Sequence, residues 1–190
     1  MKIIGITYYD GSENVVLKSD SSMLVNRKPL FVPEATSDLQ VLPCWVLRVS
    51  RLGRCVAPRF AARYYDAVAP GCDFFAADLL REAKASGKPW TEAMAFEGSL
   101  AFGKWQSHEA PVLKCEWQLQ RAEERVAEQT WSGDLREVFA QAVARASRLL
   151  TIRQGDLIYV ALQQTPWQLQ ANDLLRCVCD GEELLYCKIK

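Results

Sequence analysis

The sequence predicts a mixed, mostly β, α+β domain with short flanking helices. Many short apolar runs are separated by turn residues, two or three segments have helical spacing, and strands and helices do not alternate regularly. The chain has 190 residues, of which 49% are hydrophobic, and this suffices for a core of its own. Because no repeat, low-complexity tract or linker interrupts it, residues 1–190 are expected to form a single domain.

The predicted strands are short apolar runs bounded by turn residues. They are Lys2–Thr7, Val15–Lys18, Trp45–Ser50, a run ending at Asp73, a run ending near Glu97-Gly98-Ser99, Val112–Leu119, Glu124–Gln129, Leu157–Ala161, Leu174–Cys179 and Leu184–Ile189. Asp10-Gly11-Ser12 predicts a tight turn after the first strand, and Asp180-Gly181 predicts a hairpin between the last two. Pro33 and Pro43 indicate loops around Leu39–Leu42.

Three segments carry apolar residues at helical spacing. The first runs from Pro58 to Val68 and is expected to end at Pro70-Gly71. Residues 76–86 form the second, with Gly87 as a C-terminal cap. The third, residues 135–150, has the longest apolar stripe and is expected to pack against the core.

Composition excludes several classes of function. Lys plus Arg and Asp plus Glu both total 23, so the chain has no overall basic field for nucleic acid or for an anionic membrane. No apolar run approaches the roughly 18 residues of a membrane span. We therefore expect a cytoplasmic protein that binds neither nucleic acid nor membranes.

The seven cysteines form no Cys-x-x-Cys pair, and structural zinc usually needs two such pairs. The closest pair, Cys177 and Cys179, would lie on one face of a strand. We expect the cysteines to be buried, reduced and part of the core, because free cysteine is among the most buried residue types. Redox or metal roles, for example of Cys44 or Cys72, stay open.

Asp73 is the first candidate functional residue, because an acid that ends a buried strand just before a helix points its carboxylate at a fixed place. Strand alternation sends its neighbour Cys72 to the opposite face. The one histidine, His108, lies in a polar segment and is expected to be a solvated surface residue.

The order of several segments resembles the fumarylacetoacetate hydrolase family, whose members hydrolyse or decarboxylate β-dicarbonyl acids with a divalent metal. The resemblance covers nearly the whole chain. It rests on MKIIGI, LKSDSSMLVNRKPLFVP, VLRVSRLGR, AARYYDAVAPGCDFFAADL, GKPWTEAMAFEGS, and QGDLIY followed by Asp173 and a terminal Ile-Lys. It implies a mixed β-sheet roll or barrel flanked by short helices, and a homodimer.

The resemblance also implies a metal site in which a Glu-x-Glu pair and an Asp hold Mg2+ or Mn2+. In this chain the two Glu positions fall on Leu42 and Cys44, and the Asp position falls on Asp73. A lone carboxylate is not expected to hold a hard divalent ion, and a thiol is too soft to replace a glutamate. The lysine of the family's Ala-Lys-x-Phe-Asp motif is replaced by Met94.

Two hypotheses about function follow. The favoured one is a pseudoenzyme that has lost the metal, needs no cofactor, and has a binding, structural or regulatory role. The alternative is an active enzyme of altered mechanism that acts on a β-dicarbonyl acid, or binds a small carboxylic acid, with Asp73, Lys18 and Glu97 as pocket residues. Lys18 matches a lysine of the family's Lys-Pro-x-Ser segment, although pairing with Asp20 would explain it as well.

Overall fold

The computed structural model describes residues 1–9, 13–109, 114–161 and 165–190, which form two β-sheets and a few short helices. The strands are β1 (Lys2–Tyr8), β2 (Glu13–Ser19), β3 (Met23–Val25), β4 (Leu39–Val49), β5 (Tyr65–Ala76), β6 (Leu100–Phe102), β7 (Gln106–Ser107), β8 (Lys114–Arg121), β9 (Glu124–Ser132), β10 (Leu157–Ala161), β11 (Trp167–Gln168), β12 (Leu174–Cys179) and β13 (Glu182–Lys188). The helices are α1 (Ala77–Ser86), α2 (Thr91–Met94) and α3 (Arg136–Leu149), with 3-10 turns η1 (Asp20–Ser22) and η2 (Pro58–Arg63).

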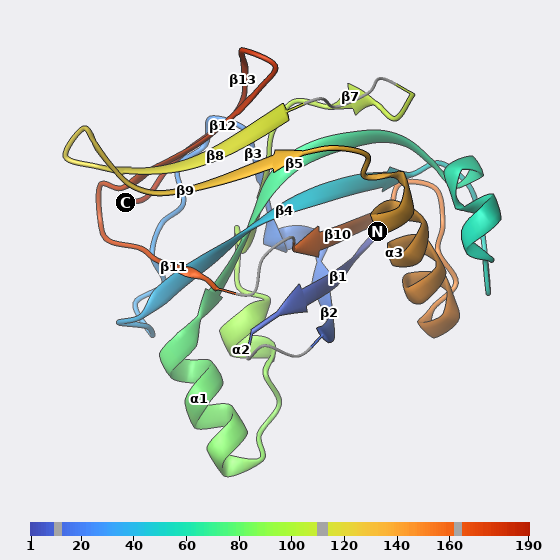
Figure 1. The fold of residues 1–190 in the computed structure, drawn as a ribbon. Coiled ribbons are helices and arrows are strands. Elements are labelled where there is room, and N and C mark those ends of the chain that lie inside the picture. Colours follow the sequence, from blue (N-terminus) through green and yellow to red (C-terminus); the bar gives the residue numbers. More distant parts are fainter. Residues whose placement is uncertain (10–12, 110–113, 162–164) are drawn as a thin grey trace.

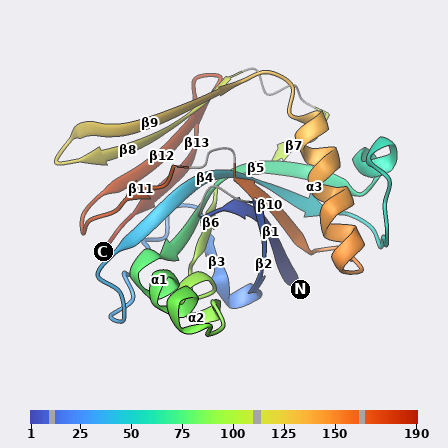
Figure 2. The ribbon, with the colours of Figure 1, turned by 60° about the horizontal axis from the view of Figure 1, so that its bottom comes forward.

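The large sheet is mixed, and its main path runs β2-β1-β10-β4-β5-β6-β3. In it β1 pairs with β10, and β3 with β6, in parallel, whereas the other pairs are antiparallel. A smaller antiparallel sheet has the order β13-β12-β8-β9. The small sheet lies on one side of the large sheet and α1 and α2 on the other, with α3 at the end away from them (Figures 1 and 2). The mostly β, α+β prediction is confirmed.

Two buried clusters cover the two faces of the large sheet. One lies between the two sheets and includes the buried side of α3, and it contains Trp45, Trp117 and Phe139. The other lies on the opposite face, and it contains Leu42 and Tyr159. Because both faces are covered, β4 and β5 are buried along almost their whole length and lack the alternation of a half-exposed strand.

Two prolines that were expected to interrupt structure lie inside long strands. Pro43 is part of β4, so the loop prediction for Leu39–Leu42 is wrong. It lies between the β4 segments that pair with β10 and with β11. Pro70 likewise lies in β5, between the segments that pair with β7 and with β6. A proline without an amide hydrogen is tolerated where one side of the strand has no ladder partner.

The helical predictions are confirmed in part. Residues 76–86 and 135–150 correspond to α1 and α3, and Gly87 caps α1 in the left-handed region with φ of 66°. The helix predicted from Pro58 to Val68 is wrong, because a 3-10 turn ends at Arg63 and Tyr65–Val68 pair with β4 instead. The strand predicted to end near Glu97 is also wrong, since short helix α2 precedes β6.

The Asp180-Gly181 turn joins β12 to β13 as predicted. The predicted turn at Asp10-Gly11-Ser12, and the first two residues of the strand predicted from Val112, lie outside the described residues. None of the helices in the described ranges combines the length and the hydropathy needed to cross a bilayer.

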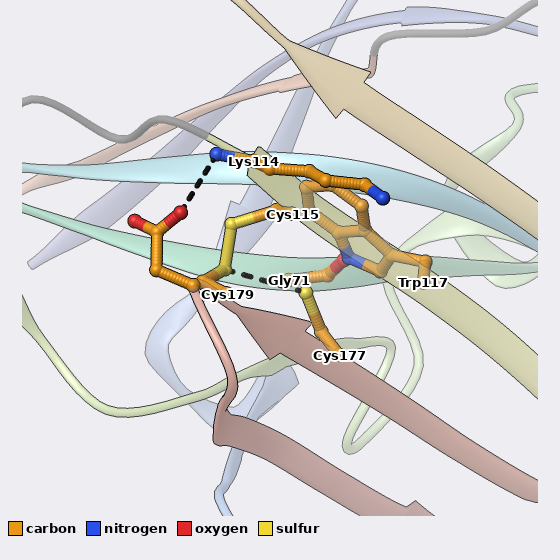
Figure 3. Close-up of a disulfide and its surroundings, with 7 residues drawn as sticks. Gly71, Lys114, Cys115, Trp117, Cys177 and Cys179 are labelled. Atoms are coloured by element: carbon orange, nitrogen blue, oxygen red, sulfur yellow. Dashed lines mark hydrogen bonds between the residues drawn. A yellow bond between two sulfur atoms is a disulfide. The ribbon is translucent and has the colours of Figure 1, made fainter.

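The expectation that all cysteines are reduced and buried is wrong for three of them. Cys115 on β8 and Cys179 on β12 form a disulfide between paired strands (Figure 3), and Cys55 is exposed. The pair is 64 residues apart, so sequence spacing gives no hint of it. Cys44 and Cys72, in contrast, are free and buried as expected.

Gly103 is where the large sheet meets the small one, and we expect Gly103→Ala to lower the free energy of unfolding by about 1–3 kcal/mol. A Cβ here would lie 2.2 Å from the backbone oxygen of Leu184, which also accepts a hydrogen bond from the Lys104 amide. Urea denaturation measures the change. Lys104→Ala is the control, because it removes only an exposed ion pair with Glu182. Equal stability of the two variants would contradict this account.

Candidate functional site

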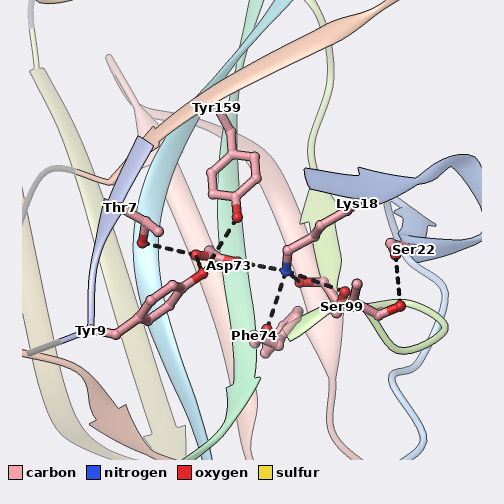
Figure 4. A network of polar contacts seen from close by, with 9 residues as sticks. Thr7, Tyr9, Lys18, Ser22, Asp73, Phe74, Ser99 and Tyr159 are labelled. Carbon is pink, nitrogen blue, oxygen red and sulfur yellow. Dashed lines mark hydrogen bonds and ion pairs between the residues drawn. The ribbon is translucent and has the colours of Figure 1, made fainter. Parts of the chain in front are cut away.

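Five strands or strand ends bring polar side chains to one buried point on the second face of the large sheet (Figure 4). Asp73 comes from β5 and Lys18 from β2. Thr7 comes from β1, Ser99 immediately precedes β6, and Tyr159 comes from β10. We call these residues, together with Tyr9, the Asp73 cluster.

An ion pair lies at the centre of the cluster. Lys18 Nζ is 2.7 Å from Asp73 Oδ1, and both side chains are completely buried. The ammonium group also donates to the backbone oxygens of Ser99 at 2.8 Å and Phe74 at 3.3 Å, and it lies 3.2 Å from Ser99 Oγ. Since an ammonium group has three hydrogens, these contacts satisfy it within the protein.

The second oxygen of Asp73 is also engaged. Thr7 Oγ1 donates to Asp73 Oδ2 at 3.0 Å, and Tyr9 Oη donates to the same oxygen at 2.8 Å. Tyr159 Oη lies 3.5 Å from Tyr9 Oη and so adds an outer hydroxyl. Both carboxylate oxygens therefore bond to neighbouring side chains, as a buried charge requires.

Tyr159 reaches this point because its strand neighbour is a glycine. Gly5 on β1 is the register partner of Tyr159 on β10. A Cβ at Gly5 would lie 2.1 Å from the Tyr159 ring, much closer than any real contact. The phenol ring therefore lies directly over Gly5, and its hydroxyl points toward Tyr9.

Burial sets the protonation of the cluster. Burial lowers the pKa of Lys18, although the charge of Asp73 partly offsets this effect. Burial, followed by the nearby Asp73 carboxylate, raises the pKa values of Tyr9 and Tyr159 well above their usual range. The two phenols are therefore neutral hydrogen-bond donors near neutral pH.

The structure brings the predicted metal-ligand positions together. Leu42 is the register partner of Asp73, and Cys44, two residues further along β4, belongs to the same buried cluster. Met94 lies in this cluster too. Cys72 packs in the other cluster, as strand alternation predicted.

Other predicted residues lie elsewhere. Glu97 is exposed in the turn between α2 and β6. Lys18 pairs with Asp73 and not with Asp20. His108 is half-buried against the Tyr65 ring, with Nδ1 3.1 Å from the backbone oxygen of Asp66, so it is less solvated than predicted.

Sequence reasoning missed Thr7, Tyr9, Ser99 and Tyr159. The alternation of β1 places Thr7 on the face of Ile3 and Gly5, and Tyr159 stands in the QGDLIY segment, but neither pattern names Asp73 as a partner. Their common target lies on a strand distant in sequence. Only the order in which the strands pair brings these residues to Asp73, and no local sequence pattern gives that order.

The cluster offers a poor set of ligands for Mg2+ or Mn2+. These ions require several oxygen ligands, usually including two or more carboxylates. Beside Asp73 the structure has an aliphatic side chain at Leu42 and a thiol at Cys44, whose pKa is raised by burial and by the Asp73 charge. The Lys18 ammonium group, 2.7 Å from the carboxylate, would also repel a bound cation.

A separate cavity of about 960 Å³ lies between η2, β5 and α3. Its lining includes Tyr65, Val68 and Phe139, and none of the residues of the Asp73 cluster lines it. The described part of the chain therefore places its polar cluster and this cavity in different regions.

A model of one protein family, described as Fumarylacetoacetate (FAA) hydrolase C-terminal, matches residues 8–185. No curated protein matches the chain. Among solved structures, the chain resembles a candidate fumarylpyruvate hydrolase from Burkholderia cenocepacia, with 19% identity and a TM-score of 0.82 over 100% of this chain and 88% of that one. The fumarylpyruvate hydrolase from Pseudomonas aeruginosa, solved with Mn2+ and pyruvate, is 18% identical with a TM-score of 0.79, over 99% of this chain and 88% of that one.

The 5-carboxymethyl-2-hydroxymuconate delta-isomerase from Mycobacterium smegmatis is 14% identical, with a TM-score of 0.78 over 99% of this chain and 78% of that one. At such identities the likeness concerns the fold alone. It confirms the expected mixed sheet of the fumarylacetoacetate hydrolase type with short helices.

Removing one member of the ion pair should strongly destabilise the protein. We expect Lys18→Met to lower the free energy of unfolding by about 3–5 kcal/mol, because Asp73 is left as an unpaired buried charge. Adding Asp73→Leu to Lys18→Met should recover part of the loss. Urea denaturation of the two single variants and the double variant gives the coupling. Additive losses would contradict a direct pair.

Stability should fall as the pH rises above about 8.5, where cysteine side chains of the unfolded chain begin to lose protons. The folded state keeps its protons on Cys44, Tyr9 and Tyr159, because their pKa values are raised. The folded state then binds more protons than the unfolded state, so the free energy of unfolding decreases with pH. Lys18 has a lowered pKa, so this one group makes the free energy of unfolding increase with pH and offsets part of the decrease.

Urea midpoints at pH 7.5, 9 and 10.5 would measure this slope. Cys44→Ala should reduce it by up to about 1.4 kcal/mol per pH unit in the range where only the unfolded thiol ionises. An equal pH slope in the wild type and in Cys44→Ala would show that the Cys44 thiol ionises in the folded protein as readily as in the unfolded chain.

Proposed function

Since this chain belongs to the fumarylacetoacetate hydrolase C-terminal family, we propose that it is a member without metal-dependent hydrolase or decarboxylase activity. Its role is binding, structural or regulatory. The observation that carries this proposal is that both carboxylate oxygens of Asp73 are already bonded within the protein. The side chain is completely buried, and its partners are Lys18, Thr7 and Tyr9.

Three features support it. Asp73 has no second carboxylate among its described partners, because Leu42 and Cys44 fill the neighbouring positions. Met94, at the position that resembles the catalytic lysine of the family, is 1% exposed and packs with them. A β-dicarbonyl acid is anionic, and the hydrogens of the cation beside Asp73, Lys18, are already donated to Asp73 and to the backbone oxygen of Ser99.

The alternative is an enzyme of altered mechanism on a β-dicarbonyl acid. One observation favours it: burial lowers the pKa of Lys18, as is typical of catalytic amines. Such a role requires the amine to leave Asp73 and meet a substrate. The homodimer, the small carboxylic acid ligand and the cytoplasmic location also stay predictions.

We expect the purified protein to bind neither Mn2+ nor Mg2+ stoichiometrically. Paramagnetic resonance of free Mn2+ should show no decrease when wild-type protein is added, because a single carboxylate paired with an ammonium group cannot compete with hydration. Metal analysis of the protein as isolated, and assays of acylpyruvate hydrolysis and oxaloacetate decarboxylation, complete the measurement.

Two variants make the test specific. Leu42→Glu/Cys44→Glu supplies carboxylates at the two positions beside Asp73, so Mn2+ binding by this variant alone would locate the lost site. Asp73→Asn is the negative control. One-to-one Mn2+ binding by the wild type, or turnover that Asp73→Asn abolishes, would refute the proposal and favour the alternative enzyme.

A further inference from the structure

The sulfur atoms of three cysteines converge between β8 and β12, on the opposite face of the large sheet from Asp73. Cys115 and Cys179 are register partners on these strands and form the disulfide. Cys177 precedes Cys179 by two residues and therefore lies on the same face of β12. Figure 3 shows its thiol beside the disulfide.

The three sulfur atoms are close enough together for one metal ion to contact all of them. Cys177 Sγ is 3.7 Å from Cys179 Sγ, and the three Sγ atoms all lie within 4.8 Å of one another. Exposure is 0% for Cys115 and Cys177 and 7% for Cys179. Cys179 ends its strand next to exposed Asp180, so the site is nearest to solvent at this turn.

The donor set is purely sulfur. In the described ranges, the group contains no histidine or carboxylate as a fourth ligand. Zinc in structural sites takes four ligands, and Mg2+ or Ca2+ takes oxygen. Soft thiolates select Cu(I), zinc and iron–sulfur clusters, but iron–sulfur clusters, like structural zinc, usually take four protein ligands. Cu(I) accepts three sulfur ligands. A dry site with three sulfurs therefore matches a monovalent soft cation better than a divalent one.

We propose that Cys115, Cys177 and Cys179 form a Cu(I) site in the reduced protein, and that the Cys115–Cys179 disulfide is its closed, metal-free state. The proposal does not rest on the absence of hydrolase activity, because it concerns the other face of the sheet.

The chemistry balances with one reductant. A dithiol gives two electrons and two protons to the Cys115–Cys179 bond, becomes a cyclic disulfide itself, and leaves two thiols. Cu(I) then binds three sulfurs and displaces one proton from each thiol, because the thiolate is the ligand. A small disulfide such as oxidised glutathione reverses the reduction: it takes two electrons and two protons from the Cys115 and Cys179 thiols, becomes two thiols itself, and re-forms the bond. Cys177 is then left alone, which is too few ligands for tight binding.

The ordinary alternative is that these cysteines only fill the core. Cys187 does so: it is free, 1% exposed, and outside the three-sulfur group. It lies on β13, next to β12, in the same buried cluster as Cys177. Cys187→Ala is therefore a matched control for Cys177→Ala in depth, side-chain size and location.

The test uses the full chain, reduced with dithiothreitol and freed of it without oxygen. Cu(I) is supplied as its coloured complex with bicinchoninate, and loss of colour reports transfer to protein. We expect transfer of one equivalent to wild type and to Cys187→Ala, and no such transfer to Cys177→Ala or Cys115→Ala. Wild type treated with oxidised glutathione, with the disulfide confirmed by mass spectrometry, should also take up none.

Folding of the variants is checked by circular dichroism, with Cys177→Ser as the substitute if Cys177→Ala does not fold. Alkylation of the reduced wild type, compared with and without Cu(I), provides a readout free of mutation. Cu(I) should slow the reaction of Cys115, Cys177 and Cys179 beyond the effect of their burial, and should leave exposed Cys55 and buried Cys187 unchanged. Uptake that Cys177→Ala retains, protection spread over all cysteines, no transfer to reduced wild type, or a preference for Zn2+ over Cu(I) would each overturn the proposal.

Discussion

The Lys18–Asp73 ion pair connects two strands that are not neighbours. In the large sheet β1, β10 and β4 lie between β2 and β5. Strands are about 4.8 Å apart, so four spacings in a flat sheet would separate β2 from β5 by about 19 Å, beyond the reach of the two side chains. Lys18 Nζ nevertheless lies 2.7 Å from Asp73 Oδ1. The sheet must therefore curl until β2 faces β5, and the pair marks the inside of the curl.

This curl explains why the polar cluster is so completely bonded. Inside a closed roll, water cannot replace a lost partner, so every donor and acceptor must find one within the protein. Thr7 and Tyr9 donate hydrogen bonds to the carboxylate of Asp73. The backbone oxygen of Ser99 accepts a hydrogen bond from the ammonium group of Lys18. Gly5 leaves space for the Tyr159 ring. A buried ion pair gives little net stability relative to apolar packing. Its effect is to penalise any register in which the two charges do not meet.

Local patterns predicted the elements whose causes are local. The apolar stripe of α3, the Gly87 cap and the Asp180-Gly181 hairpin each depend on residues close in sequence. Pro43 and Pro70 were misinterpreted because a proline ends a strand only if a neighbour needs its amide, and neighbours are set by the fold. For the same reason Asp73 was recognised as a candidate but wrongly expected to end its strand, since β5 continues to Ala76. Its partner Lys18 lies 55 residues earlier, and local pairing with Asp20 explained that lysine equally well from the sequence.

Adjacent residues of β5 face two interiors of different chemistry. Asp73 lies among oxygen and nitrogen donors on one face, and Cys72 packs on the other face in the same cluster as the three clustered cysteines. Hard cations take oxygen ligands, which would have to be added beside Asp73 as carboxylates, whereas soft cations take sulfur. Because the strand separates the two faces, a substitution that changes Mn2+ binding beside Asp73 should leave Cu(I) uptake at Cys177 unchanged, and the reverse. The two proposals therefore stand or fail independently, although a single strand carries residues of both faces.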